Sequence, residues 1–251
     1  MSFFKKLFGK KGEKKPQETN IPQNNANHVP IKLTEQRKKS LEICAQAGFK
    51  PARSLPTTWD TNLRPSVEIA GRLHAIKAMI LWLLVPAENM PDEPILSFIT
   101  NNKLDAFMSD DELKIFTSPR DDEQLRNSIG WKFENAWPLA WYFGYDEPEI
   151  YGNMMSGEQM QVILMDFTAS LEDSLEEWVS QQTTLSEAEI IQKEDLFYCL
   201  HNAVRSAQYG RDTVPKGFDP MANGGVIHER RHSLTWMLST GTDWDDTDLS
   251  T

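Results

Sequence analysis

The most hydrophobic stretch of the chain is residues 66–85, which read S-V-E-I-A-G-R-L-H-A-I-K-A-M-I-L-W-L-L-V. Its apolar side chains recur every three to four positions, the period of one face of an α-helix, and Pro86 ends the pattern. Beyond position 75, Lys77 is the sole charged residue, so we expect that half of the helix to be buried on nearly all sides. The run is too short to cross a bilayer, which takes about 20 apolar residues. We expect His74 to lie at the edge of the buried face rather than to bind a ligand.

Helical periodicity also dominates the rest of the chain. Capping residues, glycines and prolines delimit further predicted helices over residues 34–47, 93–103, 109–117, 121–145, 157–182, 186–209 and 226–240. A strand over residues 162–167 is an open alternative, and Pro138 predicts a kink or break because proline lacks the backbone donor. The sequence therefore predicts an all-α fold, a single irregular multi-helix domain over residues 31–251, with a minor strand pair as the open exception.

The charge of the chain is unevenly distributed. Residues 1–15 hold six lysines and one glutamate, a charge of +5, so with a total of −11 the remaining residues carry −16. A body this acidic repels phosphates, which argues against binding of DNA or RNA. Cys44 and Cys199 match no metal-binding or redox spacing, and two thiols without a secretion signal indicate a reducing cytoplasm.

The first part of the chain differs from the rest in composition. Residues 1–15 combine phenylalanines and a leucine with lysines, as a short basic amphipathic segment does, and residues 16–30 are polar and punctuated by proline. We therefore expect a flexible basic tail and linker over residues 1–30. Weak, transient contact of residues 1–15 with an anionic membrane is the alternative to a fully solvated tail.

One motif has the spacing of a catalytic site. His228-Glu229-Arg230-Arg231-His232 fits H-E-x-x-H, which on a helix places two imidazoles on one face as Zn²⁺ ligands, with the glutamate beside the bound water. The two arginines inside the motif disfavour a dication electrostatically, and no third ligand follows at the usual spacing. A zinc-dependent hydrolase with Glu229 as catalytic residue, and His228 and His232 as metal ligands, is the second hypothesis for function.

The leading interpretation of the same cluster is structural. Glu229 and the two arginines would pair with charges on neighbouring helices, such as Glu134 or Arg205. Loss of Glu229 or Arg230 would then destabilise the fold by several kcal/mol, because a buried charge would be left unpaired. A third hypothesis needs no metal and proposes a polar pocket for a small anion, lined by Glu134, His201, Arg205, Glu229 and Arg230.

Three segments carry a resemblance to a known family. They are residues 131–141 (W-K-F-E-N-A-W-P-L-A-W), residues 196–207 with Asn202-Ala203-Val204-Arg205, and residues 226–236 (V-I-H-E-R-R-H-S-L-T-W) followed by W-D-D at 244–246. In this order, over residues 65–247, they resemble the bacterial domain of unknown function 4272 (DUF4272) family. Pro138 and His228 depart from the family pattern. The resemblance implies a mostly helical bacterial domain without an established activity.

Together these observations favour a non-enzymatic cytoplasmic protein that binds another protein through an aromatic, polar-lined surface. Trp137, Trp141 and Trp236 are the tryptophans expected on that surface. No cofactor is predicted, because the sequence shows no glycine-rich phosphate loop and no serine or cysteine nucleophile in a recognisable setting.

Overall fold

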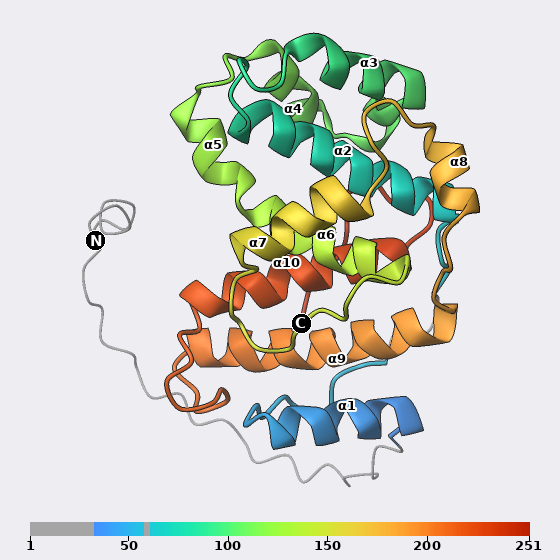
Figure 1. Cartoon of the computed structure of the whole chain (residues 1–251). Helices are drawn as coiled ribbons and strands as arrows, with labels where there is room; N and C mark the ends of the chain where they lie inside the picture. The colour runs from blue at the N-terminus through green and yellow to red at the C-terminus, as the bar shows by residue number, and fades with distance from the viewer. Residues whose placement is uncertain (1–32, 58–60) are drawn as a thin grey trace, which may run out of the picture. The chain divides into compact units, whose positions relative to one another are not determined.

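The computed structural model describes residues 33–57 and 61–251, and over these residues the protein is built from helices (Figure 1). In chain order the α-helices are α1 (Glu35–Gln46), α2 (Ser66–Leu84), α3 (Asp92–Asn102), α4 (Asp110–Leu113), α5 (Glu123–Ile129), α6 (Trp131–Tyr142), α7 (Gly157–Gln161), α8 (Leu175–Ser180), α9 (Glu187–Gln208) and α10 (Ala222–Met237). The 3₁₀ turns η2 (Leu104–Phe107) and η3 (Lys114–Thr117) and the π-helical segment η4 (Val162–Phe167) complete this part of the chain.

The predicted all-α class is confirmed. Among the described residues, the extended pairing amounts to a single parallel bridge between Asn62 and Ser239. No helix in these residues is long and apolar enough to cross a membrane. The basic tail and linker expected over residues 1–30 lie outside the described residues.

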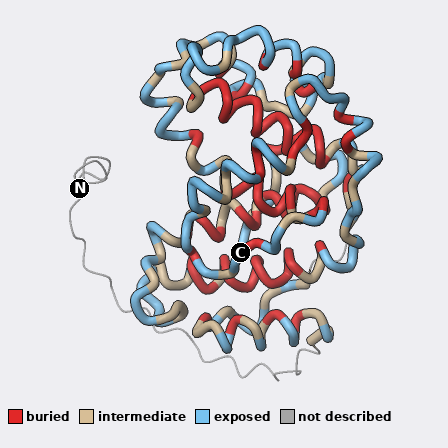
Figure 2. The backbone as a smooth tube through the Cα atoms, in the orientation of Figure 1, coloured by how far each residue is buried: buried red, intermediate tan, exposed pale blue. Residues whose placement is uncertain are grey.

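Helix α2 is the central helix, packed against α3, α5, α6 and α8. Every residue from Ile69 to Leu83 is buried, as its apolar sequence predicts, and Figure 2 shows the helix buried along most of its length. The prediction that His74 lies at the edge of this face is wrong, because its side chain is fully buried. One ring nitrogen contacts the carbonyl of Ala70 at 2.7 Å, and the other accepts from the N–H of Ala169 at 3.0 Å. Both nitrogens are therefore satisfied without water.

The lower part of the domain in Figure 1 stacks four helices, with α9 between α1 and α10, and α10 between α9 and α6. A buried ion pair joins α1 to α9, with Arg37 Nη2 2.7 Å from Asp195 Oδ1. Cys44 and Cys199 are buried in the same interface. A hydrogen bond between the two thiols, together with burial, raises the pKa of Cys44 well above its usual range.

Helix α10 begins earlier than the sequence predicts. The predicted start lies after Gly224 and Gly225, but the helix begins at Ala222 and contains both glycines. A Cβ atom on Gly224 would lie 2.6 Å from Val204 on α9, and one on Gly225 would lie 2.6 Å from Trp131 on α6. The glycine pair is thus a point of close helix packing inside α10 rather than the boundary before it.

The single long helix predicted over residues 157–182 is also wrong. The structure has α7, then the π-helical η4 in place of the alternative strand, then a turn, then α8. The chain leaves the helix at Thr168, where two residues of α2 bind the backbone of Ala169. His74 accepts the N–H of Ala169, and the Lys77 ammonium donates to its carbonyl. These long-range contacts override the local helical period.

The sequence predicts a kink or break at Pro138, but the helix does not break there. Helix α6 continues through Pro138 to Tyr142, and the break falls at Gly130, between α5 and α6. The residues around the proline are buried between α2 and α10. We attribute the continuity to this packing, which offsets the missing backbone hydrogen bond.

Candidate functional site

The centre of the charged cluster is a buried ion pair between α6 and α10. The side chains of Glu134 and Arg230 are 1% and 0% exposed, and Arg230 Nη2 lies 2.7 Å from Glu134 Oε2. The other carboxylate oxygen accepts from the N–H of Met155 at 2.7 Å. The guanidinium also donates to backbone carbonyls of the loop before α7, those of Glu149, Tyr151 and Asn153. The pair therefore fastens this loop to the two helices and is not open to a ligand.

Arg231 holds the end of the described chain. Its guanidinium donates to the carbonyls of Leu249 at 2.9 Å and Ser250 at 3.3 Å, and its Nε lies 3.6 Å from a carboxylate oxygen of Glu194. It also lies 2.8 Å from Nδ1 of His201. Burial, and then the charge of Arg231, lower the pKa of His201 to about 3. His201 is therefore neutral at pH 7.

The two histidines of the H-E-x-x-H motif have separate partners. His228 Nδ1 lies 3.4 Å from Nε2 of His201. His232 Nε2 lies 2.9 Å from the carbonyl oxygen of Trp244, and its ring stacks on that indole at 4.2 Å. Within residues 33–57 and 61–251, no group of three or more histidine, cysteine, aspartate or glutamate side chains is placed to hold a metal ion. This arrangement favours the structural interpretation of the motif over a zinc site.

Glu229 lies apart from the buried charges. Its side chain is 23% exposed, its carboxylate accepts from Asn135 Nδ2 at 2.9 Å, and it does not pair with Arg205. The expectation of a large stability loss therefore applies to Arg230 and not to Glu229.

We expect the substitution Glu229→Gln to lower the free energy of unfolding by less than about 1 kcal/mol, because the amide oxygen can still accept from Asn135. Urea denaturation of the variant and the parent measures this difference. A loss above about 2 kcal/mol would show that the carboxylate belongs to the buried charge network after all.

The three tryptophans expected to form an aromatic surface do not form one. Trp137 and Trp236 are buried, at 3% and 4% exposed. The Arg230 guanidinium covers the ring of Trp137 at 4.6 Å, and the Lys193 ammonium lies 5.4 Å from the ring of Trp141. Their ring faces thus serve internal packing against the chain's own cations.

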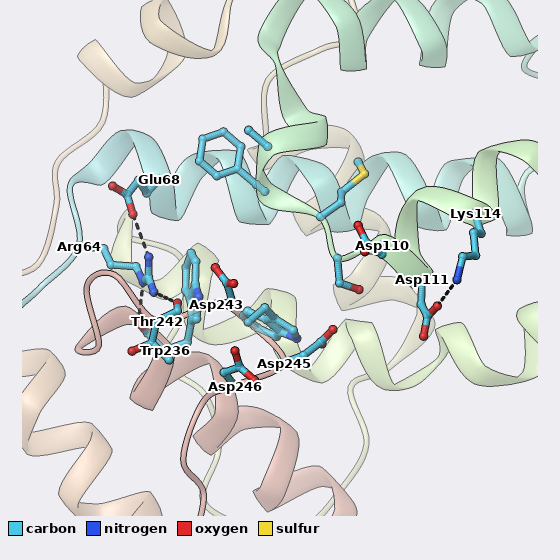
Figure 3. Close-up of a pocket in the computed structure, with 15 residues that line it drawn as sticks. Arg64, Glu68, Asp110, Asp111, Lys114, Trp236, Thr242, Asp243, Asp245 and Asp246 are labelled. Atoms are coloured by element: carbon cyan, nitrogen blue, oxygen red, sulfur yellow. Dashed lines mark hydrogen bonds and ion pairs between the residues drawn. The ribbon is translucent and has the colours of Figure 1, made fainter.

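A cleft of about 930 Å³ lies where the segment after α10 passes η2 and α4. It is lined by Arg64, Glu68, residues 106–111, Lys114, Trp236 and residues 242–246. Figure 3 shows carboxylates from two distant parts of the chain around one opening, Asp110 and Asp111 on α4 and Asp243, Asp245 and Asp246 after α10.

Negative charge in this cleft exceeds positive charge. Arg64 and Lys114 are its cations, and both are already paired, with Glu68 at 2.9 Å and with Asp111 at 2.6 Å. Four carboxylates of the cleft remain, those of Asp110, Asp243, Asp245 and Asp246. They are exposed and make no ion pair with any other residue that the structure describes. We call this site the acidic cleft. Because none of these four carboxylates has an ion-pair partner among the described residues, the cleft attracts cations.

The floor of the acidic cleft is formed by indoles that the chain's own arginines cover. The Arg64 guanidinium covers the ring of Trp236 at 4.1 Å, and the Arg72 guanidinium covers that of Trp244 at 3.8 Å. Arg72 is itself fixed by a buried ion pair with Glu112 at 2.6 Å. Because the chain's own arginines cover these indoles, the cleft presents carboxylate charge rather than open aromatic faces.

Part of the predicted polar cluster lines a second, smaller pocket of about 490 Å³. Its lining residues are His201, Arg205, His228, Leu249, Ser250 and Thr251. The structure thus brings together two residues of the predicted anion pocket, His201 and Arg205, and adds His228. Glu134 and Arg230 are buried elsewhere, and Glu229 does not line the pocket.

The sequence prediction missed the acidic cleft. The residues W-D-D at 244–246 belong to one of the segments that carry the family resemblance, and Asp110 and Asp111 start a predicted helix. Both signals were visible, but helix N-termini commonly carry acidic residues, and nothing in the sequence places the two segments side by side.

The fold and these sites define a class of protein, an all-helical domain with a buried arginine network and an acidic cleft. The model of the family described as Domain of unknown function (DUF4272) matches residues 36–247. The chain belongs to this family, and the match begins within α1, ahead of residues 65–247, over which the sequence motifs resemble the family. No curated protein and no solved structure matches the chain.

Proposed function

We propose that the protein is a non-enzymatic binding module whose acidic cleft takes a lysine- or arginine-rich segment of another protein. The observation that carries this proposal is the group of four exposed carboxylates without a cation partner among the described residues, Asp110, Asp243, Asp245 and Asp246. Basic side chains form charge-assisted hydrogen bonds with carboxylates, which are stronger than those between neutral groups.

The size and lining of the cleft support a peptide ligand. Its volume of about 930 Å³ leaves room for more than one basic side chain. Phe107 and Met108 are half-buried in its wall and offer apolar contact to the aliphatic stems of lysine or arginine. The charge of −16 outside residues 1–15 also draws a basic partner towards the protein and raises the association rate.

A basic peptide fits the cleft better than a methylated ammonium ion does. Recognition of methylated ammonium relies on open aromatic faces, and here arginines cover Trp236 and Trp244. We place this module in the bacterial cytoplasm, and the two free, buried thiols of Cys44 and Cys199 support a reducing compartment.

The experiment titrates a lysine-rich synthetic peptide into the protein by isothermal calorimetry. We expect the triple variant Asp243→Asn, Asp245→Asn, Asp246→Asn to bind at least about tenfold more weakly than the parent. We also expect the affinity of the parent to fall as salt is added, because exposed charges are screened.

A matched control removes the same charge from another exposed acidic group, on and just before α8. The variant Glu172→Gln, Glu176→Gln, Glu177→Gln should bind the peptide within about twofold of the parent. Equal weakening in both triple variants would show attraction to net charge alone and would contradict the proposal. Absence of peptide binding by the parent would contradict it as well.

A further inference from the structure

We propose that the smaller pocket between α9, α10 and the end of the described chain binds a phosphate group through Arg205 and His228. The pocket shares no lining residue with the acidic cleft. It is therefore independent of the proposed function, and either can fail without the other.

The proton positions in this pocket follow from one arginine. Arg231 always carries its protons, so Nδ1 of His201, 2.8 Å away, accepts from it, and the proton of that neutral ring lies on Nε2. This Nε2–H faces Nδ1 of His228 at 3.4 Å. Nδ1 of His228 is then the acceptor, and its own proton lies on Nε2. Arg231 thus makes His228 a hydrogen-bond donor at Nε2.

The side chains that line the pocket offer spare donors. Arg205 donates to Gln208 at 2.8 Å and to Tyr209 at 3.4 Å, and these contacts use two of the five N–H groups of its guanidinium. Among the described residues, no aspartate or glutamate side chain lines the pocket, and the α-carboxylate of Thr251 is the acidic group of its lining. The Glu229 carboxylate does not line the pocket, although its Oε1 lies 4.0 Å from His228 Nε2, while its Oε2 accepts from Asn135 at 2.9 Å. A pocket with surplus donors suits an oxyanion.

The electrostatic setting agrees with this geometry. Burial lowers the pKa of His228, and the positive charges of Arg231 and Arg205 lower it further against the opposite effect of Glu229. The same positive potential attracts an anion. The volume of about 490 Å³ is larger than a free phosphate ion needs, so there is room for a small organic group attached to it.

Calorimetric titration with two probes, inorganic phosphate and O-phosphoserine, tests the proposal. We expect the parent to bind at least one of them with a Kd below about 1 mM. The variant Arg205→Met should bind at least about tenfold more weakly, and it should fold normally because this side chain is exposed. Arg126→Met removes an exposed arginine from α5 and should bind within about twofold of the parent.

Every outcome of this experiment is informative. Tighter binding of O-phosphoserine identifies a phosphorylated small molecule as the ligand class, and tighter binding of inorganic phosphate identifies the free ion. Either result supports the site if Arg205→Met weakens it. The proposal is overturned if neither probe binds the parent with a Kd below about 1 mM, or if Arg205→Met binds as the parent does.

Discussion

Replacement of Arg230 by methionine is expected to lower the free energy of unfolding by about 3–5 kcal/mol. The substitution leaves the Glu134 carboxylate buried, at 1% exposed, without its cation. It also removes the donors to three carbonyls of the loop before α7, which then have no partner from this side chain. Urea denaturation of the parent and the variant measures the loss.

A double variant separates the charge effect from simple loss of packing. In Arg230→Met with Glu134→Gln, the buried charge is gone and the amide oxygen can still accept from Met155, so we expect part of the stability to return. Arg211→Met, at an exposed position, should change the stability by less than about 0.5 kcal/mol. If Arg230→Met is no less stable than this control, the ion pair does not hold the loop.

Acidification from pH 7 to about pH 5 is expected to remove about 4 kcal/mol of stability, about 2 kcal/mol for each of His74 and His201. Burial is the largest cause that lowers the pKa of both, to about 3, whereas the unfolded chain protonates near 6.5. Between these values the unfolded chain binds protons that the folded protein does not. The stability that the two neutral histidines contribute is therefore complete above pH 6.5 and is lost as the pH falls below that value.

Other groups modify this pH dependence. Burial lowers the pKa of His232 to about 4, which adds to the loss, and burial raises the pKa of Glu194, which opposes it. Arg72 lowers the pKa of Glu112 to about 2 although burial opposes the shift, so this group loses its contribution only below about pH 4.5.

A histidine variant isolates the effect. The stability of His74→Gln, measured by urea denaturation across this range, should fall by about 2 kcal/mol less than that of the parent, whatever its stability at pH 7. His201→Gln should show the same shallower slope. Slopes equal to that of the parent in both variants would show that these two histidines do not account for acid sensitivity.

Residues 66–85 show how much of the fold the sequence could predict. The helix and its burial follow from apolar side chains at every angular position, which is local information. The burial of His74 and Lys77 could not be predicted, because the groups that satisfy them belong to the turn at Ala169, 95 residues beyond His74. The turn at Ala169 also ends the helix that the apolar period predicts to continue over residues 157–182.

The candidate site likewise contains one feature that the sequence predicts and one that it does not. The sequence predicted that Arg230 and Arg231 would pair with charges on neighbouring helices, with Glu134 as one candidate, and the structure pairs Glu134 with Arg230. It did not reveal the acidic cleft, whose two walls come from α4 and from the segment after α10. Their proximity depends on how α10 packs, and the sequence pattern predicts Gly224 and Gly225 to precede this helix, whereas they lie inside it at points of close packing.

The most direct test of the acidic cleft is an NMR titration that follows the indole N–H resonances, assigned by single tryptophan-to-phenylalanine variants, as the lysine-rich peptide is added. The cleft is lined by Trp236 and Trp244, whereas Trp82 and Trp178 do not line it. We predict that the resonances of Trp236 and Trp244 move with the peptide concentration and that those of Trp82 and Trp178 stay in place. Stationary Trp236 and Trp244 resonances, or equal shifts of all four, would contradict binding in the acidic cleft.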